Sequence, residues 1–194
     1  EGLFDTTSAV SATLNINPLP VVTFSEIPSP CIDAGQFNLT QGSPVGGTYS
    51  GPGISTSPQF DPADAGLGNH TITYTYTDGN GCVNSATQTI TVIALPAPAV
   101  NGPTESCLDG SGVFSTPLNA NHSYSWSITG ATASSPVDVN QVTIEFNTPG
   151  TAVIQVTETN DITGCSATSA VYNVTVYDKP AIGEIQSDNK LTRR

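Results

Sequence analysis

The sequence has very few basic residues, and their placement excludes whole classes of partner. Its 194 residues carry 16 Asp or Glu but only four Lys or Arg, which gives a formal net charge of −12. All four basic residues lie between Lys179 and Arg194. A nucleic-acid binder needs clustered cations to displace counterions from phosphates, and an anionic membrane surface attracts the same cations. We therefore predict no nucleic-acid partner and no direct membrane insertion.

Methionine, long apolar runs and helix-forming segments are also missing. No run of 18 apolar residues is present, which argues against a membrane-spanning helix. The chain instead has 18 Gly and 15 Pro, which interrupt it every few residues and favour short strands joined by tight turns. Hydrophobic residues make up 37% of the sequence and charged residues only 10%, a balance that favours packed cores over disorder.

Three segments of the sequence resemble one another and mark an internal repeat. Each is an alternating strand pattern that ends at a proline, and these prolines are Pro20, Pro96 and Pro180, spaced 76 and 84 residues apart. The cysteines keep the same phase. One lies 11 residues after each of the first two prolines, and one lies 14 or 15 residues before each of the last two. We infer a tandem repeat of about 80 residues.

The repeat predicts two complete modules, 18–95 and 96–179. Residues 1–17 are expected to form the terminal strand of a preceding module or an exchangeable strand, and residues 180–194 the start of a next module or a tail. The proline-rich joints around Pro20 and Pro96 are expected to be extended and stiff. We therefore expect the modules to follow one another in an elongated arrangement.

Each module shows the alternation of an antiparallel β-sandwich. Residues 71–77 alternate strictly, which places Ile72, Tyr74 and Tyr76 on one face of a strand. The glycine-rich segment 78–81 then predicts a hairpin turn, because Gly and Asn tolerate a positive φ. The second module repeats the pattern. The predicted fold class is all-β, with two tandem sandwiches.

The second module carries motifs of a known family. Tyr124 and Trp126 stand in a Y-x-W strand pattern, residues 146–150 read F-x-x-P-G before an alternating strand, and Gly-Cys at 164–165 ends a hairpin. These motifs resemble the PKD-like domain, which is an immunoglobulin-like (Ig-like) β-sandwich. The resemblance implies that both modules are Ig-like sandwiches, with Trp126 in the core of the second.

The first module resembles an Ig-like repeat that is abundant in large surface proteins of the Bacteroidota. The segments that carry this resemblance are 46–54, 60–66 and 73–82. Such surface proteins include gliding-motility adhesins exported by the type IX secretion system. The resemblance implies a secreted, cell-surface protein that takes part in cell adhesion, with neighbouring modules of the same long chain as partners.

The four cysteines allow three disulfide pairings, and the repeat phase selects one of them. It predicts the bonds Cys31–Cys82 and Cys107–Cys165, one in each module. Each bond would close a loop of about 50 residues, worth roughly 4 kcal/mol in the chain-entropy model. Disulfides favour a secreted location. Four free, buried thiols are the alternative, and a zinc site is disfavoured because the sequence has no C-x-x-C pair.

The sequence offers no catalytic constellation. Its two histidines, His70 and His122, are expected at the edges of strands, and without a well-placed histidine there is no Ser–His or Cys–His pair. Asp61 and Asp64 lie in Asp-Pro-Ala-Asp-Ala-Gly, which is typical of a turn capped by Asp rather than of the paired carboxylates of a glycosidase. We predict a protein that is not an enzyme.

Calcium is the main alternative role for the acidic residues. Hard cations bind several oxygen ligands, often from loops, whereas turn chemistry explains the same residues without a metal. Two groups of side chains are candidate ligands: Asp61, Asp64, Asp78 and Asn80 in the first module, and Glu158, Asn160 and Asp161 in the second.

The sequence suggests two roles for sugars, one as a covalent modification and one as a bound ligand. Asp5-Thr6-Thr7 resembles the D-S/T-x O-glycosylation motif of the Bacteroidota, which makes Thr6 a candidate for modification. Tyr49, Tyr172 and Tyr177 are candidates for contact with surface glycans if they are exposed, and core or cross-strand partners otherwise.

Three functions follow from these patterns. The first is a non-catalytic stalk or adhesive segment of a secreted surface adhesin. The second is a subunit of an extracellular fibre in which residues 1–17 add a strand to a neighbouring chain. The third is a carbohydrate-binding accessory module of an extracellular enzyme.

Overall fold

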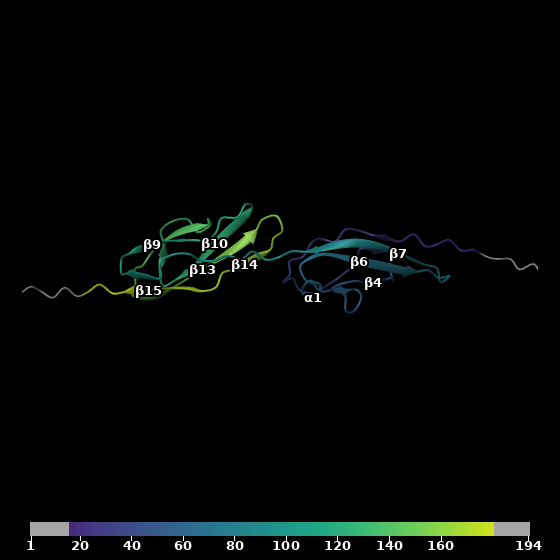
Figure 1. Ribbon diagram of the computed structural model, residues 1–194, viewed down its shortest axis with the longest axis horizontal. Coiled ribbons are helices and arrows are strands. Elements are labelled where there is room, and N and C mark those ends of the chain that lie inside the picture. Colours follow the sequence, from purple (N-terminus) through teal and green to yellow (C-terminus); the bar gives the residue numbers. More distant parts are fainter. Residues whose placement is uncertain (1–15, 181–194) are drawn as a thin grey trace, which may run out of the picture. The chain divides into compact units, whose positions relative to one another are not determined.

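The computed structural model describes residues 16–180, and within them the chain divides into two compact units between Ile93 and Ala94 (Figure 1). The fold class is all-β with predominantly antiparallel sheets, as the sequence predicts. The module boundaries 18–95 and 96–179 remain predictions. Thr6 and most of the predicted terminal segments 1–17 and 180–194 lie outside the described residues.

The first unit is built around one long hairpin and several short strands. The alternating segment predicted at 71–77 belongs to a ten-residue strand, and a second ten-residue strand returns beside it. The elements are β1 (Thr23–Phe24), β2 (Phe37–Asn38), β3 (Gly42–Ser43), β4 (Thr48–Ser50), β5 (Gln59–Phe60), α1 (Pro62–Ala65), β6 (Gly68–Thr77) and β7 (Val83–Val92).

In this unit β6 pairs with β7 along its whole length and with β4 on its other edge (Figure 1). Two short antiparallel pairs, β1 with β3 and β2 with β5, complete the strands. Ile72 and Tyr74 point inward from β6 and are 0% and 2% exposed, while Tyr76 is half-buried against the same core. The strict alternation along β6 thus separates a core face from a threonine-rich outer face.

The second unit has the fuller set of strands. Its longest strand begins at the Pro-Gly predicted to open it. The elements are β8 (Glu105–Cys107), β9 (Ser111–Ser115), β10 (His122–Thr129), β11 (Thr132–Ala133), β12 (Gln141–Glu145), β13 (Gly150–Asn160), β14 (Ser166–Thr168) and β15 (Tyr172–Tyr177).

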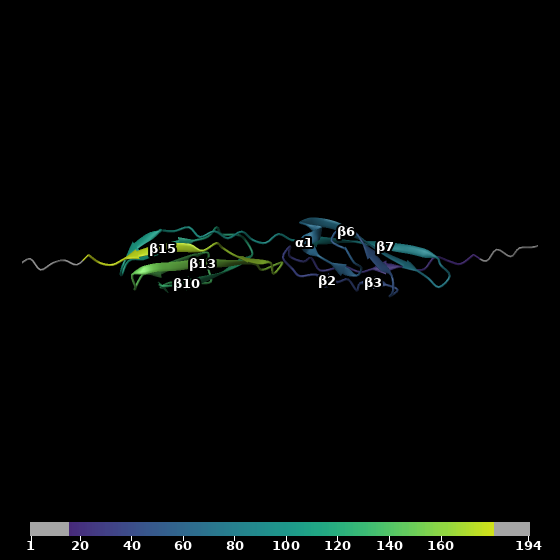
Figure 2. The same cartoon turned by 90° about the horizontal axis from the view of Figure 1, so that it is seen from below.

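Two sheets enclose the core of the second unit. One has the order β10-β13-β15-β8, with β14 also paired to β13, and the other has the order β11-β12-β9. Figure 2 shows β10, β13 and β15 side by side. Trp126 lies in the core, as predicted, and its indole Nε1 donates to the carbonyl oxygen of Val139 at 2.7 Å. A buried indole N–H needs such a partner.

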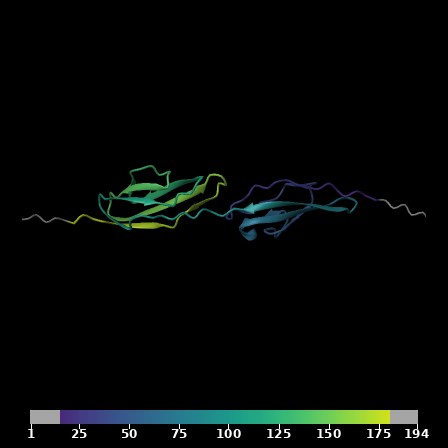
Figure 3. The ribbon, with the colours of Figure 1, turned by 45° about the horizontal axis from the view of Figure 1, so that its top comes forward.

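Each unit has a parallel backbone contact between an early segment and the end of the unit. In the second unit β8 pairs with β15, so that Cys107 faces Tyr177. In the first unit Cys31 forms a parallel bridge with Ile93, directly after β7. The other end of β7 meets the incoming chain, because the side-chain amide of Asn84 donates to the carbonyl oxygen of Pro20 at 2.9 Å. Figure 3 shows this incoming segment beside the β6–β7 hairpin. The first unit therefore receives the chain at one end of its last strand and releases it at the other.

The short helix α1 is a local capping structure. Asp61 is its N-cap, and its Oδ1 accepts hydrogen bonds from the amides of Ala63 and Asp64, at 2.9 and 3.4 Å. Pro62 suits the first turn, where no donor is needed. Along residues 16–180, no helix is both long enough and apolar enough to cross a membrane.

Candidate functional site

Each unit has two cysteines, one at each of its ends. In the first unit these are Cys31 and Cys82. The amide of Ile32, next to Cys31, donates to the carbonyl oxygen of Ile93 at 2.9 Å, which places Cys31 where β7 ends. Cys82 directly precedes Val83, where β7 begins. Ten strand residues at about 3.3 Å each separate the two positions by roughly 33 Å.

The second unit has the same arrangement around β13. Cys107 faces Tyr177 beside the start of β13, since Val176 pairs with Gly150. Cys165 lies at the other end, where its carbonyl oxygen accepts the amide of Asn160 at 2.9 Å. The eleven residues of β13 keep these two cysteines apart by about 36 Å.

This geometry corrects the predicted disulfides. A disulfide requires two Cα atoms within about 7 Å, so Cys31–Cys82 and Cys107–Cys165 cannot form within these folded units. Cys31 and Cys165 are disulfide-bonded, whereas Cys82 and Cys107 are free thiols. The repeat phase identified equivalent cysteines correctly in sequence, but one cysteine of each predicted pair sits at the wrong end of a long strand.

The candidate calcium ligands of the first unit do not converge. Asp61 caps α1, just before β6 begins, and also accepts the side-chain amide of Gln36 at 2.7 Å. Hydrogen bonding from Gln36 lowers the pKa of Asp61, with smaller contributions from the backbone amides of α1. Asp78 follows the other end of β6 and binds the amides of Asn80 and Cys82, each at 2.9 Å. The carboxylates act as turn and helix caps at opposite ends of a ten-residue strand.

The candidate ligands of the second unit are also engaged by protein donors. Asn160 accepts the amides of Ile162 and Thr163 at 3.0 and 3.1 Å, and the exposed Asp161 accepts the hydroxyl of Ser123 at 2.6 Å. No group of three or more His, Cys, Asp or Glu in the described part of the chain has a metal-binding arrangement.

Glu158 forms a buried polar cluster that the sequence did not reveal. Its side chain is only 1% exposed, and its Oε1 accepts Nδ2 of Asn119 at 2.6 Å and contacts Nδ1 of His122 at 2.7 Å. His122 is the first residue of β10, as its predicted edge position implies, and β10 pairs with β13. Alternation along β13 could have placed Glu158 on the inner face, since Ile154 and Val156 share its parity. The cluster therefore ties β10 and the segment before it to β13 through a buried carboxylate.

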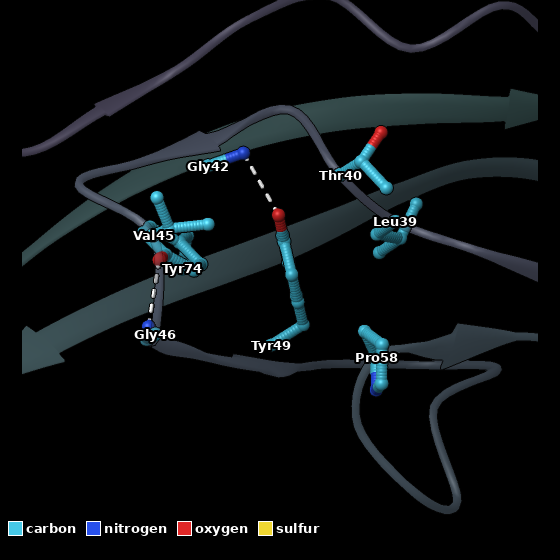
Figure 4. A pocket seen from close by; sticks show the side chains of 9 residues that line it. Leu39, Thr40, Gly42, Val45, Gly46, Tyr49, Pro58 and Tyr74 are labelled. Atoms are coloured by element: carbon cyan, nitrogen blue, oxygen red, sulfur yellow. Dashed lines mark hydrogen bonds between the residues drawn. The ribbon is translucent and has the colours of Figure 1, made fainter.

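A small, partly open cavity in the first unit is lined in part by two tyrosines. Its volume is about 210 Å³, and its lining includes Leu39, Val45, Pro58, Tyr49 and Tyr74 (Figure 4). The Tyr49 hydroxyl accepts the Gly42 amide at 2.8 Å. Burial raises the pKa of Tyr49. The cavity is smaller than the ~300 Å³ at which ligand pockets begin, and both hydroxyls bind backbone groups.

The exposed-tyrosine hypothesis holds for one residue of three. Tyr49 is a core residue at 7% exposure. Tyr172 packs edge-on against Phe114 and donates to the carbonyl oxygen of Gly102 at 2.5 Å. Tyr177 is 51% exposed, and its hydroxyl contacts Glu105, whose charge raises the pKa of Tyr177. Of these three tyrosines, Tyr177 is therefore the one that is accessible to a surface glycan.

Comparison with known proteins identifies no family. No known family and no curated protein matches the sequence. Among solved structures, the D00-D0 domain of intimin is similar, with 16% identity, a TM-score of 0.36, and coverage of 79% of this chain and 98% of that one. The fibronectin(III)-like modules of Clostridium thermocellum CbhA share 14% identity, with a TM-score of 0.36 and coverage of 84% and 97%. Murine CEACAM1b shares 14% identity, with a TM-score of 0.34 and coverage of 80% and 100%. At these identities and TM-scores the likeness carries no conclusion about function, which rests on the chain's own residues.

Proposed function

We propose that this chain is a non-catalytic structural and adhesive segment of a secreted cell-surface protein, in which successive sandwiches form a stalk. The observation that carries the proposal is the course of the chain through each unit. In the first unit the last strand, β7, begins beside the incoming chain and ends where the chain leaves, so the chain advances by about the length of β7. In the second unit β8 runs parallel to the last strand, β15, and the longest strand is β13. A strand of eleven residues spans roughly 36 Å.

The surface chemistry supports this function. The strands present threonine and serine on their outer faces, and residues 1–178 contain no Lys or Arg, which leaves trypsin-like proteases no site there. Two of the four cysteines are disulfide-bonded, a state favoured by oxidising compartments. Several candidate ligands also have structural roles, since Asp61 and Asp78 cap turns and Glu158 lies in the core.

The finer part of the proposal is the cellular context. The motif resemblance to PKD-like and Ig-like repeats favours a type IX secreted, gliding-adhesin-like protein of the Bacteroidota, with neighbouring modules and surface glycans as partners. An antibody raised against the chain should then label intact, unpermeabilised source cells. Labelling that appears only after permeabilisation would contradict this location.

Small-angle X-ray scattering of the reduced, monomeric chain tests the stalk itself. A compact protein of this length has a radius of gyration of about 16 Å. Two units of about 40 Å each, placed end to end, give roughly 23 Å for a rod about 80 Å long. A stalk predicts the larger value, whereas a value near 16 Å would contradict it.

A further inference from the structure

We propose that Cys82 and Cys107 are the two halves of a head-to-tail disulfide, in which Cys107 of one copy of this chain bonds Cys82 of the next copy. The proposal rests on the structural equivalence of the two units, since each free thiol has a counterpart in the other unit that is disulfide-bonded. It deepens the proposed stalk function by adding a covalent joint.

Cys82 and Cys165 are counterparts because they end the same kind of turn. In the first unit the Asp78 amide donates to the carbonyl oxygen of Cys82 at 3.0 Å, and Gly81, with φ of 83°, precedes the cysteine. In the second unit the Asn160 amide donates to the carbonyl oxygen of Cys165 at 2.9 Å, and Gly164, with φ of 76°, precedes it. Asp78 and Asn160 each accept two backbone amides through their side chains.

Cys107 and Cys31 are counterparts because they occupy the same place beside the last strand. The residue after Cys31, Ile32, donates its amide to Ile93 at 2.9 Å, and the residue after Cys107, Leu108, donates its amide to Tyr177 at 2.8 Å. A tight turn follows in both units. The carbonyl oxygen of Cys31 accepts the amide of Ala34 at 3.0 Å, and that of Cys107 accepts the amide of Gly110 at 2.9 Å.

The bonded cysteines comprise one of each kind: Cys31, beside a last strand, and Cys165, at a hairpin turn. The free cysteines also comprise one of each kind, Cys107 and Cys82 respectively. A bond between Cys107 of one copy and Cys82 of the next would likewise use one cysteine of each kind. Such a contact is heterologous and can propagate, unlike a two-fold contact between identical thiols.

Both free thiols are accessible, and exposed apolar side chains lie next to them. Cys107 is exposed and Cys82 is half-exposed. Val83, adjacent to Cys82, is 53% exposed, and Tyr177, which faces Cys107 across the parallel pair, is 51% exposed. These side chains would lose water contact when the two ends meet, which favours association.

The bond forms by thiol–disulfide exchange with a low-molecular-weight disulfide such as oxidised glutathione. The Cys82 thiolate attacks one sulfur of glutathione disulfide, which releases one glutathione thiolate and leaves a mixed disulfide. The Cys107 thiolate of a second copy then attacks the Cys82 sulfur and releases the second glutathione. Two protein thiols are oxidised, one disulfide is reduced to two glutathiones, and the two protein protons pass to the released thiolates.

The test uses the full chain at high concentration in a glutathione redox buffer, with about 0.5 M salt to screen the acidic ends to a Debye length of roughly 4 Å. Non-reducing electrophoresis should show a ladder of multimers for the unaltered protein. Cys82→Ser and Cys107→Ser should each remain monomeric alone, and an equimolar mixture of the two should give a dimer and nothing larger. The double variant Cys82→Ser/Cys107→Ser is the matched control and should stay monomeric.

Three results would overturn the proposal: a monomeric unaltered protein with both thiols still open to alkylation, single variants that dimerise as well as their mixture, or an intramolecular Cys82–Cys107 bond. Peptic digestion at acidic pH, followed by mass spectrometry of the unaltered protein, identifies the bonded peptides even if a variant folds poorly. Failure here is distinguishable from failure of the stalk, because the scattering measurement is made on reduced monomer.

Discussion

Replacement of the buried Glu158 by alanine should destabilise the second unit selectively. The carboxylate is 1% exposed and binds Asn119 and His122, and hydrogen bonds to a charged group contribute about 1.5–3 kcal/mol each. Asn119 is exposed and His122 is 15% exposed, so both donors recover part of this free energy from water. Removal of a desolvated carboxylate also offsets part of the cost. We expect a net loss of about 2–3 kcal/mol in the free energy of unfolding.

The chain supplies its own reporter for this measurement. Trp126 is the only tryptophan of the sequence and lies in the core of the second unit, on the strand that pairs with the one carrying Glu158. Its fluorescence during thermal unfolding should report the second unit, and a loss of 2–3 kcal/mol corresponds to a fall in Tm of about 10–20 °C for a domain of this size.

Two further variants separate the causes. Glu158→Gln keeps an acceptor oxygen and should lose less than half as much, roughly 1 kcal/mol. Glu145→Ala removes an exposed glutamate from β12 of the same unit and should change the free energy of unfolding by no more than about 0.5 kcal/mol. If Glu158→Ala behaved like Glu145→Ala, the polar cluster would not stabilise the unit and the reasoning would be refuted.

Three other predictions address the first unit. Gln36→Ala should raise the pKa of Asp61 in a carbon-13 NMR titration, because the hydrogen bond from Gln36 is the largest cause of the lowered pKa. In the unaltered protein, Asp61 stabilises the fold above its unfolded pKa of about 3.9, and this stabilisation is lost as pH falls through the lower folded pKa. In the variant, the same stabilisation should be lost at a higher pH. An unmoved titration would contradict this. Gly42→Ala should destabilise the unit by about 1–3 kcal/mol in calorimetry, because the added Cβ would lie 2.6 Å from the Tyr74 ring, whereas Gly35→Ala, with open space around its Cβ, is the control. Equal melting of both variants would refute that clash. Calcium at about 5 mM, above the ~10⁻³ M dissociation constants of weak extracellular sites, should leave the calorimetric Tm unchanged, and a clear rise would reveal a site.

The fold class could be predicted from the sequence because it depends on local patterns of residues. Alternation along Ile72, Tyr74 and Tyr76 fixes the inner face of β6, and glycine-rich turns fix where β6 ends. The capping role of Asp61 was also predictable, since proline and a second acid follow it in a turn pattern. The short helix α1 could not be predicted from the sequence, because four residues are too few to show a helical periodicity.

The cysteine pairing could not be predicted from the sequence, because it depends on how far strands separate the cysteines and not on their positions within the repeat. Spacing relates Cys31 to Cys107 and Cys82 to Cys165, and the structure gives these pairs equivalent surroundings. Nothing in the spacing shows that a ten-residue strand separates Cys31 from Cys82. The cluster around Glu158 escaped notice for a related reason: Asn119 and His122 are remote from Glu158 in sequence, and only the pairing of β10 with β13 unites them.

The parallel pairing of β8 with β15 also determines how the second unit responds to being pulled by its two ends. Tension along the chain would draw β8 and β15 in opposite directions along their common axis, so that their backbone hydrogen bonds are sheared together. An antiparallel pair pulled from one end breaks its bonds one after another. The short pairings Glu105–Thr175, Ser106–Val176 and Cys107–Tyr177 are therefore the mechanical clamp of the second unit.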